Sequence, residues 1–190
     1  MTVKGLKVNS LNSSDDISGL IKIVPTSVAV GSGSGSVDAN GNVTFSSASS
    51  VSLNGCFSSA YQNYKIVLNI SASGSSDLQM RFRASGSDAT TNYNRYGIAV
   101  NSSGSTVNYG SGTTQAFFYV VQTSGIDTGA EFNLYSPFET IATRIVATSS
   151  GGTSPVFMGG RHTTASSYDG FTLYPDSTTI TGTVRVYGYN

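Results

Sequence analysis

Residues 61–70 read YQNYKIVLNI and residues 78–84 read LQMRFRA. In both stretches apolar and polar side chains alternate, which is the period of an extended strand with one buried face. The small polar residues 71–77 between them predict a hairpin loop, so we expect the two strands to pair with each other. A slip of one residue would bury Arg81 and Arg83, so the alternation should fix the register. The residues predicted to face inward are Tyr64, Ile66, Leu68, Ile70, Leu78, Met80, Phe82 and Ala84.

The composition of the whole chain also indicates an all-β protein. Its 190 residues include 22 Gly, 11 Tyr and many Ser, Thr and Val, whereas good helix formers are scarce. Only 11% of the residues are charged, and the formal net charge is zero. Such a chain exerts no long-range attraction on nucleic acid or on an anionic membrane, so we expect neither as a partner.

Two absences in the sequence suggest where the protein works. No apolar run approaches the roughly twenty residues that span a bilayer, and the opening MTVKGLKVNS lacks the apolar segment of a signal peptide. A surface poor in charge and rich in Ser, Thr and Gly is nevertheless typical of a protein outside cells. A particle that assembles in the cytoplasm of a cell and is released by lysis would reconcile the two observations.

Short apolar segments separated by turn residues continue to the C-terminus. This pattern favours an antiparallel β-sandwich of the jelly-roll type, which we assign to residues 37–190. At its start, residues 37–45 predict a hairpin in which Asn40-Gly41 forms a type I′ turn. The strands predicted from residue 51 onward are 51–53, 64–70, 78–84, 96–100, 115–122, 130–135, 143–148, 156–159, 171–174 and 179–189.

Residues 1–36 are predicted to lie outside this sandwich. Residues 1–30 are interpreted as an extended arm, and GSGSGS at residues 31–36 has the composition of a flexible linker. Within the arm, residues 17–25 form a short apolar run closed by Pro25, which suits either an edge strand or a segment that docks on a neighbour. The apolar residues expected to dock on a partner are Leu6, Val8, Leu11, Ile17, Leu20, Ile21, Ile23 and Val24.

No constellation of side chains predicts catalysis, a metal site or a bound cofactor. The chain has no G-x-S-x-G turn that would present a serine nucleophile for which the single histidine, His162, could act as base. His162 is therefore predicted to be a polar loop residue. Asp38 begins a segment similar to the start of a calcium loop, but the bidentate glutamate is missing. The ten acidic residues show no spacing that pairs two of them, as a glycosidase would require. Cys56 has no second cysteine as a partner and is predicted to be a small buried apolar residue.

Tyrosines in turn contexts are the remaining candidates for contacts. An exposed tyrosine can stack on a sugar or line a protein interface, whereas the simpler interpretation is packing at a sheet edge. The tyrosines considered as receptor or interface contacts are Tyr61, Tyr93, Tyr96, Tyr109 and Tyr168.

Several of these segments together resemble a known family. Residues 61–67 (YQNYKIV) and 78–88 (LQMRFRASGSD), followed by Asn92-Tyr93, are similar to a β-sandwich domain of tailed-bacteriophage virion proteins. The closing residues 180–189 (ITGTVRVYGY) resemble the end of that domain, and the similarity extends over residues 17–190. The resemblance implies structural or adhesive work, often as a symmetric trimer, and it includes no catalytic signature.

We therefore expect a non-enzymatic protein on the exterior of a bacteriophage virion, and foremost a capsid decoration (cement) protein. The arm would bind the major capsid protein or another virion protein, and the sandwich would associate with itself, as a homotrimer according to the resemblance. The alternative is a tail appendage, fibre or receptor-binding module whose tyrosine-bearing loops recognise a host surface glycan. An enzyme acting on envelope polysaccharide is a third possibility, and it would need two acids within about 10 Å of each other across a groove.

Overall fold

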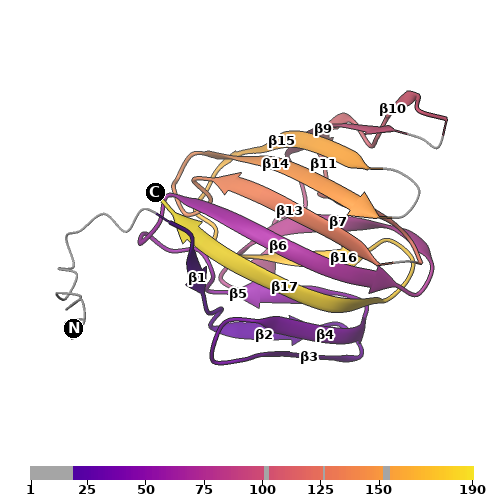
Figure 1. Ribbon diagram of the computed structural model, residues 1–190. Helices are drawn as coiled ribbons and strands as arrows, with labels where there is room; N and C mark the ends of the chain where they lie inside the picture. Colours follow the sequence, from indigo (N-terminus) through magenta and orange to yellow (C-terminus); the bar gives the residue numbers. More distant parts are fainter. Residues whose placement is uncertain (1–18, 101–102, 126, 152–154) are drawn as a thin grey trace, which may run out of the picture.

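Two antiparallel β-sheets lie face to face in the computed structural model of the chain (Figure 1). The structure describes residues 19–100, 103–125, 127–151 and 155–190. Every element within these ranges is a β-strand, and each strand pairing is antiparallel. The all-β sandwich that the sequence predicts is therefore confirmed, whereas the arm up to residue 18 lies outside the described residues.

Eleven strands of the described chain form the larger of the two sheets, which we call the large sheet. They lie in the order β10-β9-β15-β14-β13-β6-β17-β4-β3, with β11 also paired with β9 and β1 also paired with β17. Their bounds are β1 Ile21–Ile23, β3 Ser34–Val37, β4 Val43–Ala48, β6 Asn63–Ala72, β9 Tyr93–Val100, β10 Thr106–Asn108, β11 Gly112–Gln115, β13 Thr128–Tyr135, β14 Ala142–Gly151, β15 Val156–Ala165 and β17 Ile180–Tyr189.

The second sheet, which we call the small sheet, lies behind the large sheet in Figure 1. Its order is β12-β7-β16-β5-β2, and β8 pairs with β7 beside this path. The bounds are β2 Ser27–Val30, β5 Val51–Asn54, β7 Ser75–Ala84, β8 Ser87–Asp88, β12 Phe118–Ser124 and β16 Gly170–Pro175.

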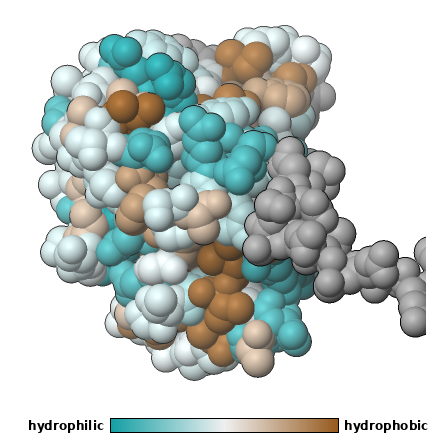
Figure 2. Space-filling model, turned by 90° about the vertical axis from the view of Figure 1, so that its left-hand side faces the viewer, coloured by the Kyte–Doolittle hydropathy of each residue, from teal (hydrophilic) through white to brown (hydrophobic). Residues whose placement is uncertain are grey.

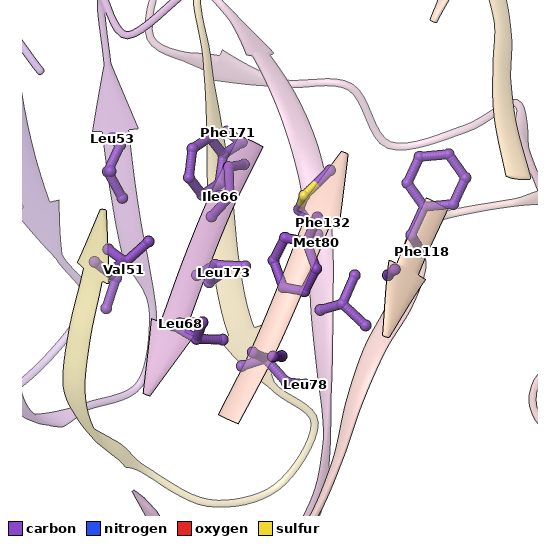
Figure 3. Close-up of a cluster of buried hydrophobic side chains, with 14 of the residues drawn as sticks. Val51, Leu53, Ile66, Leu68, Leu78, Met80, Phe118, Phe132, Phe171 and Leu173 are labelled. Carbon is purple, nitrogen blue, oxygen red and sulfur yellow. The ribbon is translucent and has the colours of Figure 1, made fainter. Parts of the chain in front are cut away.

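A single main hydrophobic core fills the space between the sheets. Side chains from β5, β7, β12 and β16 of the small sheet meet side chains from β6 and β13 of the large sheet (Figure 3). The alternating residues that the sequence places inward are buried there, except that Ala84 is half-buried. Phe82, for example, is fully buried and stacks on Tyr168 with ring centroids 5.0 Å apart. The alternation therefore identified the buried face of both strands.

The hairpin predicted from these two strands is wrong. β6 pairs with β13 and β17 in the large sheet, whereas β7 pairs with β12 and β16 in the small sheet. The connection between them crosses from one sheet to the other, and the Ser73 amide there donates to the Thr179 carbonyl over 2.9 Å. Alternation specifies which face of a strand is buried, but it does not specify the neighbouring strand.

The structure also differs from the predicted linker and from the predicted end of the arm. β1 pairs with β17, β2 pairs with β5, and β3 pairs with β4, so the described residues before position 37 belong to the sandwich. The glycines of residues 31–36 permit a close crossing from the small sheet to the large one. At Gly33, whose φ is +71°, a Cβ would lie 2.1 Å from the Ser46 carbonyl oxygen. Glycine is needed here for close backbone approach rather than for flexibility.

The hairpin predicted at residues 37–45 is present, but its turn is longer than a type I′ turn. β3 and β4 are joined by residues 38–42, in which Gly41 has a φ of +74°. The Asp38 carboxylate accepts hydrogen bonds from the amides of Asn40 and Asn42 and from the Asn42 side chain. These bonds, led by that of the Asn42 side chain, lower the pKa of Asp38. The carboxylate organises the loop, which gives a reason for its place there other than calcium binding.

The predicted strand 115–122 is divided between the two sheets. β11 pairs with β9 in the large sheet and β12 pairs with β7 in the small sheet, so the chain turns a corner at residues 116–117. Arg95 of β9 is buried at this corner and donates to the carbonyl oxygens of Gly110 and Phe117. Its guanidinium also lies 4.0 Å from the centroid of the Tyr119 ring. The buried arginine therefore connects the corner to β9 through hydrogen bonds.

Candidate binding face

Cross-strand registers place four large apolar side chains together on the outer face of the large sheet. Directly opposite residues of neighbouring strands point to the same side of a sheet. Phe157 of β15 lies opposite Ile98 of β9, and Gly159 lies between Tyr96 of β9 and Val146 of β14. The exposed fractions are 58% for Tyr96, 49% for Ile98, 46% for Val146 and 49% for Phe157. We call these four residues the apolar group.

Rigid strands hold the apolar group in place. The alternate residues of the same strands, such as Ala147 and Met158, are buried in the interior. A Cβ at Gly159 would meet no atom within 4 Å, so the surface is open between Tyr96 and Val146. A further hollow of about 330 Å³ extends from Ile98 and Phe157 toward Val107. Exposed apolar side chains gathered on ordered strands are typical of an interaction surface.

Two arginines border the apolar group. Arg144 of β14 and Arg161 of β15 are directly opposite each other and exposed. Together with Asn94, Tyr96 and Gly160 they line a hollow of about 370 Å³. Neither guanidinium has a hydrogen bond or ion pair within the part of the chain that the structure describes. Like charges directly opposite each other on a sheet are destabilising, so this pair does not contribute to the stability of the isolated fold.

The other charges on this face have partners. Lys65 forms an ion pair with Glu131 at 2.6 Å, and Lys22 donates to the Asn42 side chain. Arg185 also donates to Asn42, over 2.9 Å. Among the outward-facing described residues of the large sheet, Glu131 is the single acid beside five bases. The excess of positive charge without partners is therefore located at Arg144 and Arg161.

The outer face of the small sheet has a different character, because its charged side chains are engaged within the sheet. Arg83 pairs with Asp88 and also donates to Asn54, Ser52 and Thr172. The neighbouring Arg81 lies over the ring of Tyr174, 4.8 Å from its centroid, and donates to the Ala116 carbonyl. This network satisfies its own members, so it gives less reason to expect a partner than the face with Arg144 and Arg161.

The five tyrosines proposed as contacts have different environments. Tyr96 is the most exposed of them and belongs to the apolar group, whereas Tyr61 is half-buried against the core. Tyr93, Tyr109 and Tyr168 are buried, so the prediction that they are surface contacts is wrong. Their hydroxyl groups hydrogen-bond inside the protein, to the Ala89 carbonyl, the Asp77 carboxylate and the His162 ring respectively. Tyr93 lies on β9, whereas Tyr109 directly follows β10 and Tyr168 lies in the connection between β15 and β16.

The predicted docking residues of the arm are only partly described. Leu6, Val8, Leu11 and Ile17 lie outside the described residues. Ile21 and Ile23 are half-buried in β1, which pairs with β17 as the edge-strand interpretation of this run predicts. Leu20 and Val24 beside them are about half exposed, at 50% and 49%. On the side of the molecule seen in Figure 2, hydrophobic residues form separate small groups among hydrophilic ones.

His162 is buried on β15, and the prediction of a polar loop residue is wrong. Its Nε2 lies 2.8 Å from the Thr91 carbonyl oxygen, and its Nδ1 lies 2.9 Å from the Tyr168 hydroxyl. A carbonyl can only accept, so Nε2 carries the proton and Nδ1 accepts from Tyr168. Burial lowers the pKa of His162 and outweighs the backbone hydrogen bonds that raise it. This geometry uses both ring nitrogens for structural hydrogen bonds.

Acidic side chains of the described residues do not gather into a metal site, and no group of three or more His, Cys, Asp or Glu is present among them. One pair of acids lies on neighbouring strands, with Asp77 on β7 and Asp176 just after β16. The Asp176 amide donates to the Asp77 carbonyl, and its carboxylate accepts from Ser76. Burial raises the pKa of Asp77, which accepts from Tyr109. Both acids lie side by side at adjacent strand ends and are bound to neighbouring hydroxyl groups. Cys56 is buried as predicted.

Sequence reasoning missed Ile98, Val146 and Phe157 of the apolar group and both arginines. A signal for the apolar residues is present, because Ile145-Val146 and Val156-Phe157-Met158 interrupt the alternation with consecutive apolar residues. Such runs indicate strands that are apolar on both faces. Arg144 and Arg161 carry no such signal, since their pairing depends on the register of two strands.

Comparisons with known proteins add little to this description. No protein-family model and no curated protein matches the chain. One solved structure that is similar is the binding domain of botulinum neurotoxin serotype G, with 10% sequence identity and a TM-score of 0.25. The match covers 94% of this chain and 45% of that one, so the chain spans less than half of its length. A likeness this weak supports no argument about function. The described residues also contain no helix long and apolar enough to span a membrane.

Proposed function

We propose that this chain is a non-enzymatic structural protein on the exterior of a tailed-bacteriophage virion, where it decorates the capsid. The resemblance of residues 61–67, 78–88 and 180–189 to a virion β-sandwich domain supports this role. The observation that carries the proposal is the apolar group on the outer face of the large sheet. Exposed Tyr, Phe and Ile beside Arg have the composition of a protein interface, and the major capsid protein is the proposed partner.

The environments of the ionisable residues support a role without catalysis. His162 uses both ring nitrogens inside the protein, and Asp77 and Asp176 accept hydrogen bonds from neighbouring hydroxyl groups. A general base or nucleophile needs to reach a substrate from a cleft. These side chains instead stabilise connections between strands.

A tail module that binds host glycan is less well supported than capsid decoration. That alternative relied on tyrosine-bearing loops, and Tyr93, Tyr109 and Tyr168 are buried. Tyr96 is exposed on a strand beside aliphatic side chains rather than in a loop cleft. Aliphatic neighbours add more to a protein interface than to a sugar site, where aromatic faces and hydrogen bonds dominate.

Immunogold labelling of source virions with antibody against this chain tests the proposed placement. We expect gold particles distributed over the heads, because a decoration protein repeats with the capsid lattice. Gold confined to the tails would contradict capsid decoration and favour the tail module. Virions without label would contradict both roles.

A further inference from the structure

The described part of the fold does not explain why two arginines without a partner lie beside the apolar group. Arg144 and Arg161 are directly opposite each other on adjacent strands, where like charges repel. In the described part of the chain, no carboxylate forms an ion pair with either guanidinium. A pair of planar guanidinium groups in one hollow is well suited to binding carboxylates.

A second copy of the chain fits this site poorly. Most acids of the described residues are already engaged: Asp38 caps its loop, Glu131 pairs with Lys65, and Asp88 pairs with Arg83. Two copies joined through this same face would also bring four arginines together, because a two-fold interface is self-complementary. The charge distribution therefore favours a different molecule that is acidic.

The neighbours of the arginines indicate what kind of acidic molecule it is. Ile98, Val146 and Phe157 offer apolar area to the same ligand, and each is close to half exposed. An acidic polysaccharide would gain from the carboxylate contacts and from Tyr96, but little from Ile98 and Val146. A protein surface that combines carboxylates with apolar side chains uses the whole site.

We propose that the outer face of the large sheet at β9, β14 and β15 docks an acidic protein surface. Carboxylates of the partner lie against Arg144 and Arg161, and apolar side chains of the partner cover the apolar group. This inference rests on the proposed function in that it describes the contact surface of the capsid partner. It can nevertheless be tested without virions.

The test uses the full chain and a synthetic peptide composed of glutamate and leucine. Binding is measured by calorimetry, and the binding surface by backbone amide shifts. We expect shifts on β9, β14 and β15, and an affinity that falls as salt is added, because exposed charges are screened. The variant with Arg144→Gln and Arg161→Gln should lose about tenfold in affinity.

A matched control carries Thr44→Glu and Ser46→Glu on exposed positions of β4, which lies next to the edge strand β3 on the opposite side of the same sheet. Each double variant lowers the net charge by two, and thermal unfolding verifies that both are folded. The control should bind the peptide within a factor of about two of the wild type. An equal loss in both variants would show that net charge alone decides binding, and would overturn the inference.

Other ligands serve as competing outcomes. Equal binding of a lysine-and-leucine peptide would overturn the charge complementarity, and tighter binding of polygalacturonate would identify an acidic glycan instead. Self-association that depends on Arg144 and Arg161, measured by sedimentation, would identify a second copy as the occupant. Absence of peptide binding would also overturn the inference, but capsid decoration would remain to be judged by the labelling experiment.

Discussion

His162 illustrates how a single titratable residue is incorporated into the core. The ring donates to the Thr91 carbonyl through Nε2 and accepts from Tyr168 through Nδ1, while Phe82 and Tyr93 contact it edge to face. Protonation of Nδ1 would reverse the hydrogen bond with Tyr168, because Nδ1 would then donate to the hydroxyl oxygen, and it would place a charge among aromatic rings. The neutral ring is therefore the form that the fold stabilises.

Acidification should destabilise the protein through His162. Its pKa in the folded state lies below the ordinary value of 6.5, so below that pH the unfolded chain binds more protons and stability falls. We expect the melting temperature to decrease from about pH 7.5 to about pH 5. Asp77, whose pKa burial raises, acts in the opposite sense as it titrates.

Comparison with His162→Gln isolates this contribution. The variant should be less stable at neutral pH, because glutamine fills the ring position poorly, but it should lose much of the decrease on acidification. A melting temperature that falls equally in both proteins over this range would contradict the assignment of His162 as the neutral buried group.

At the scale of the elements, β1 and β2 determine how much of the N-terminal region can be removed without loss of strands from the sandwich. β1 covers the edge of β17, and β2 covers the edge of β5, where Val28 and Val30 pack against the core. A strand that loses its neighbour leaves backbone donors and acceptors unpaired. The boundary at residue 30 that the composition suggests therefore cuts through the sandwich.

Two deletions test this conclusion. Removal of residues 1–18 retains every described strand and serves as the reference for a longer deletion. Removal of residues 1–30 deletes β1 and β2 and should lower stability by on the order of 3 kcal/mol, a decrease of about 10 °C. Thermal unfolding of both variants is the measurement. A 1–30 deletion that melts like the full chain would contradict the observed pairing.

The local sequence predicts the strands and their buried faces, but it does not predict which strands pair. The alternation of Tyr64, Ile66 and Leu68 predicts a strand and its buried face, since both follow from local chemistry. The partner of that strand is set by contacts distant in sequence, so a hairpin with residues 78–84 was expected where a crossing between sheets occurs. The glycine and serine of residues 31–36 suit a linker and a close crossing equally well by composition.

The candidate site was harder to predict for the same reason. Of the residues that form it, the sequence predicts Tyr96 as a contact and Phe157 only as a residue of a strand. Arg144 and Arg161 are 17 positions apart in the chain and become neighbours through the β14–β15 register. Two residues that become neighbours through strand register leave no pattern in the local sequence.

At the scale of the whole molecule, a net charge of zero conceals a local imbalance. Exposed, unpaired bases gather with apolar side chains at β14 and β15, while acids such as Asp38, Asp88 and Asp176 are engaged elsewhere. Specific docking depends on the local field and on complementary shape rather than on total charge. A chain with few charges can therefore still select an acidic partner.

We propose above all that the outer face of the large sheet at the apolar group joins the protein to the particle. The decisive measurement is the rebinding of purified chain to virions that lack it, with Phe157→Ser as the variant and Ile141→Ser as the control, because Ile141 is exposed but precedes β14. We predict that Phe157→Ser weakens binding about tenfold or more while Ile141→Ser binds like the wild type. Full occupancy by Phe157→Ser would contradict the claim.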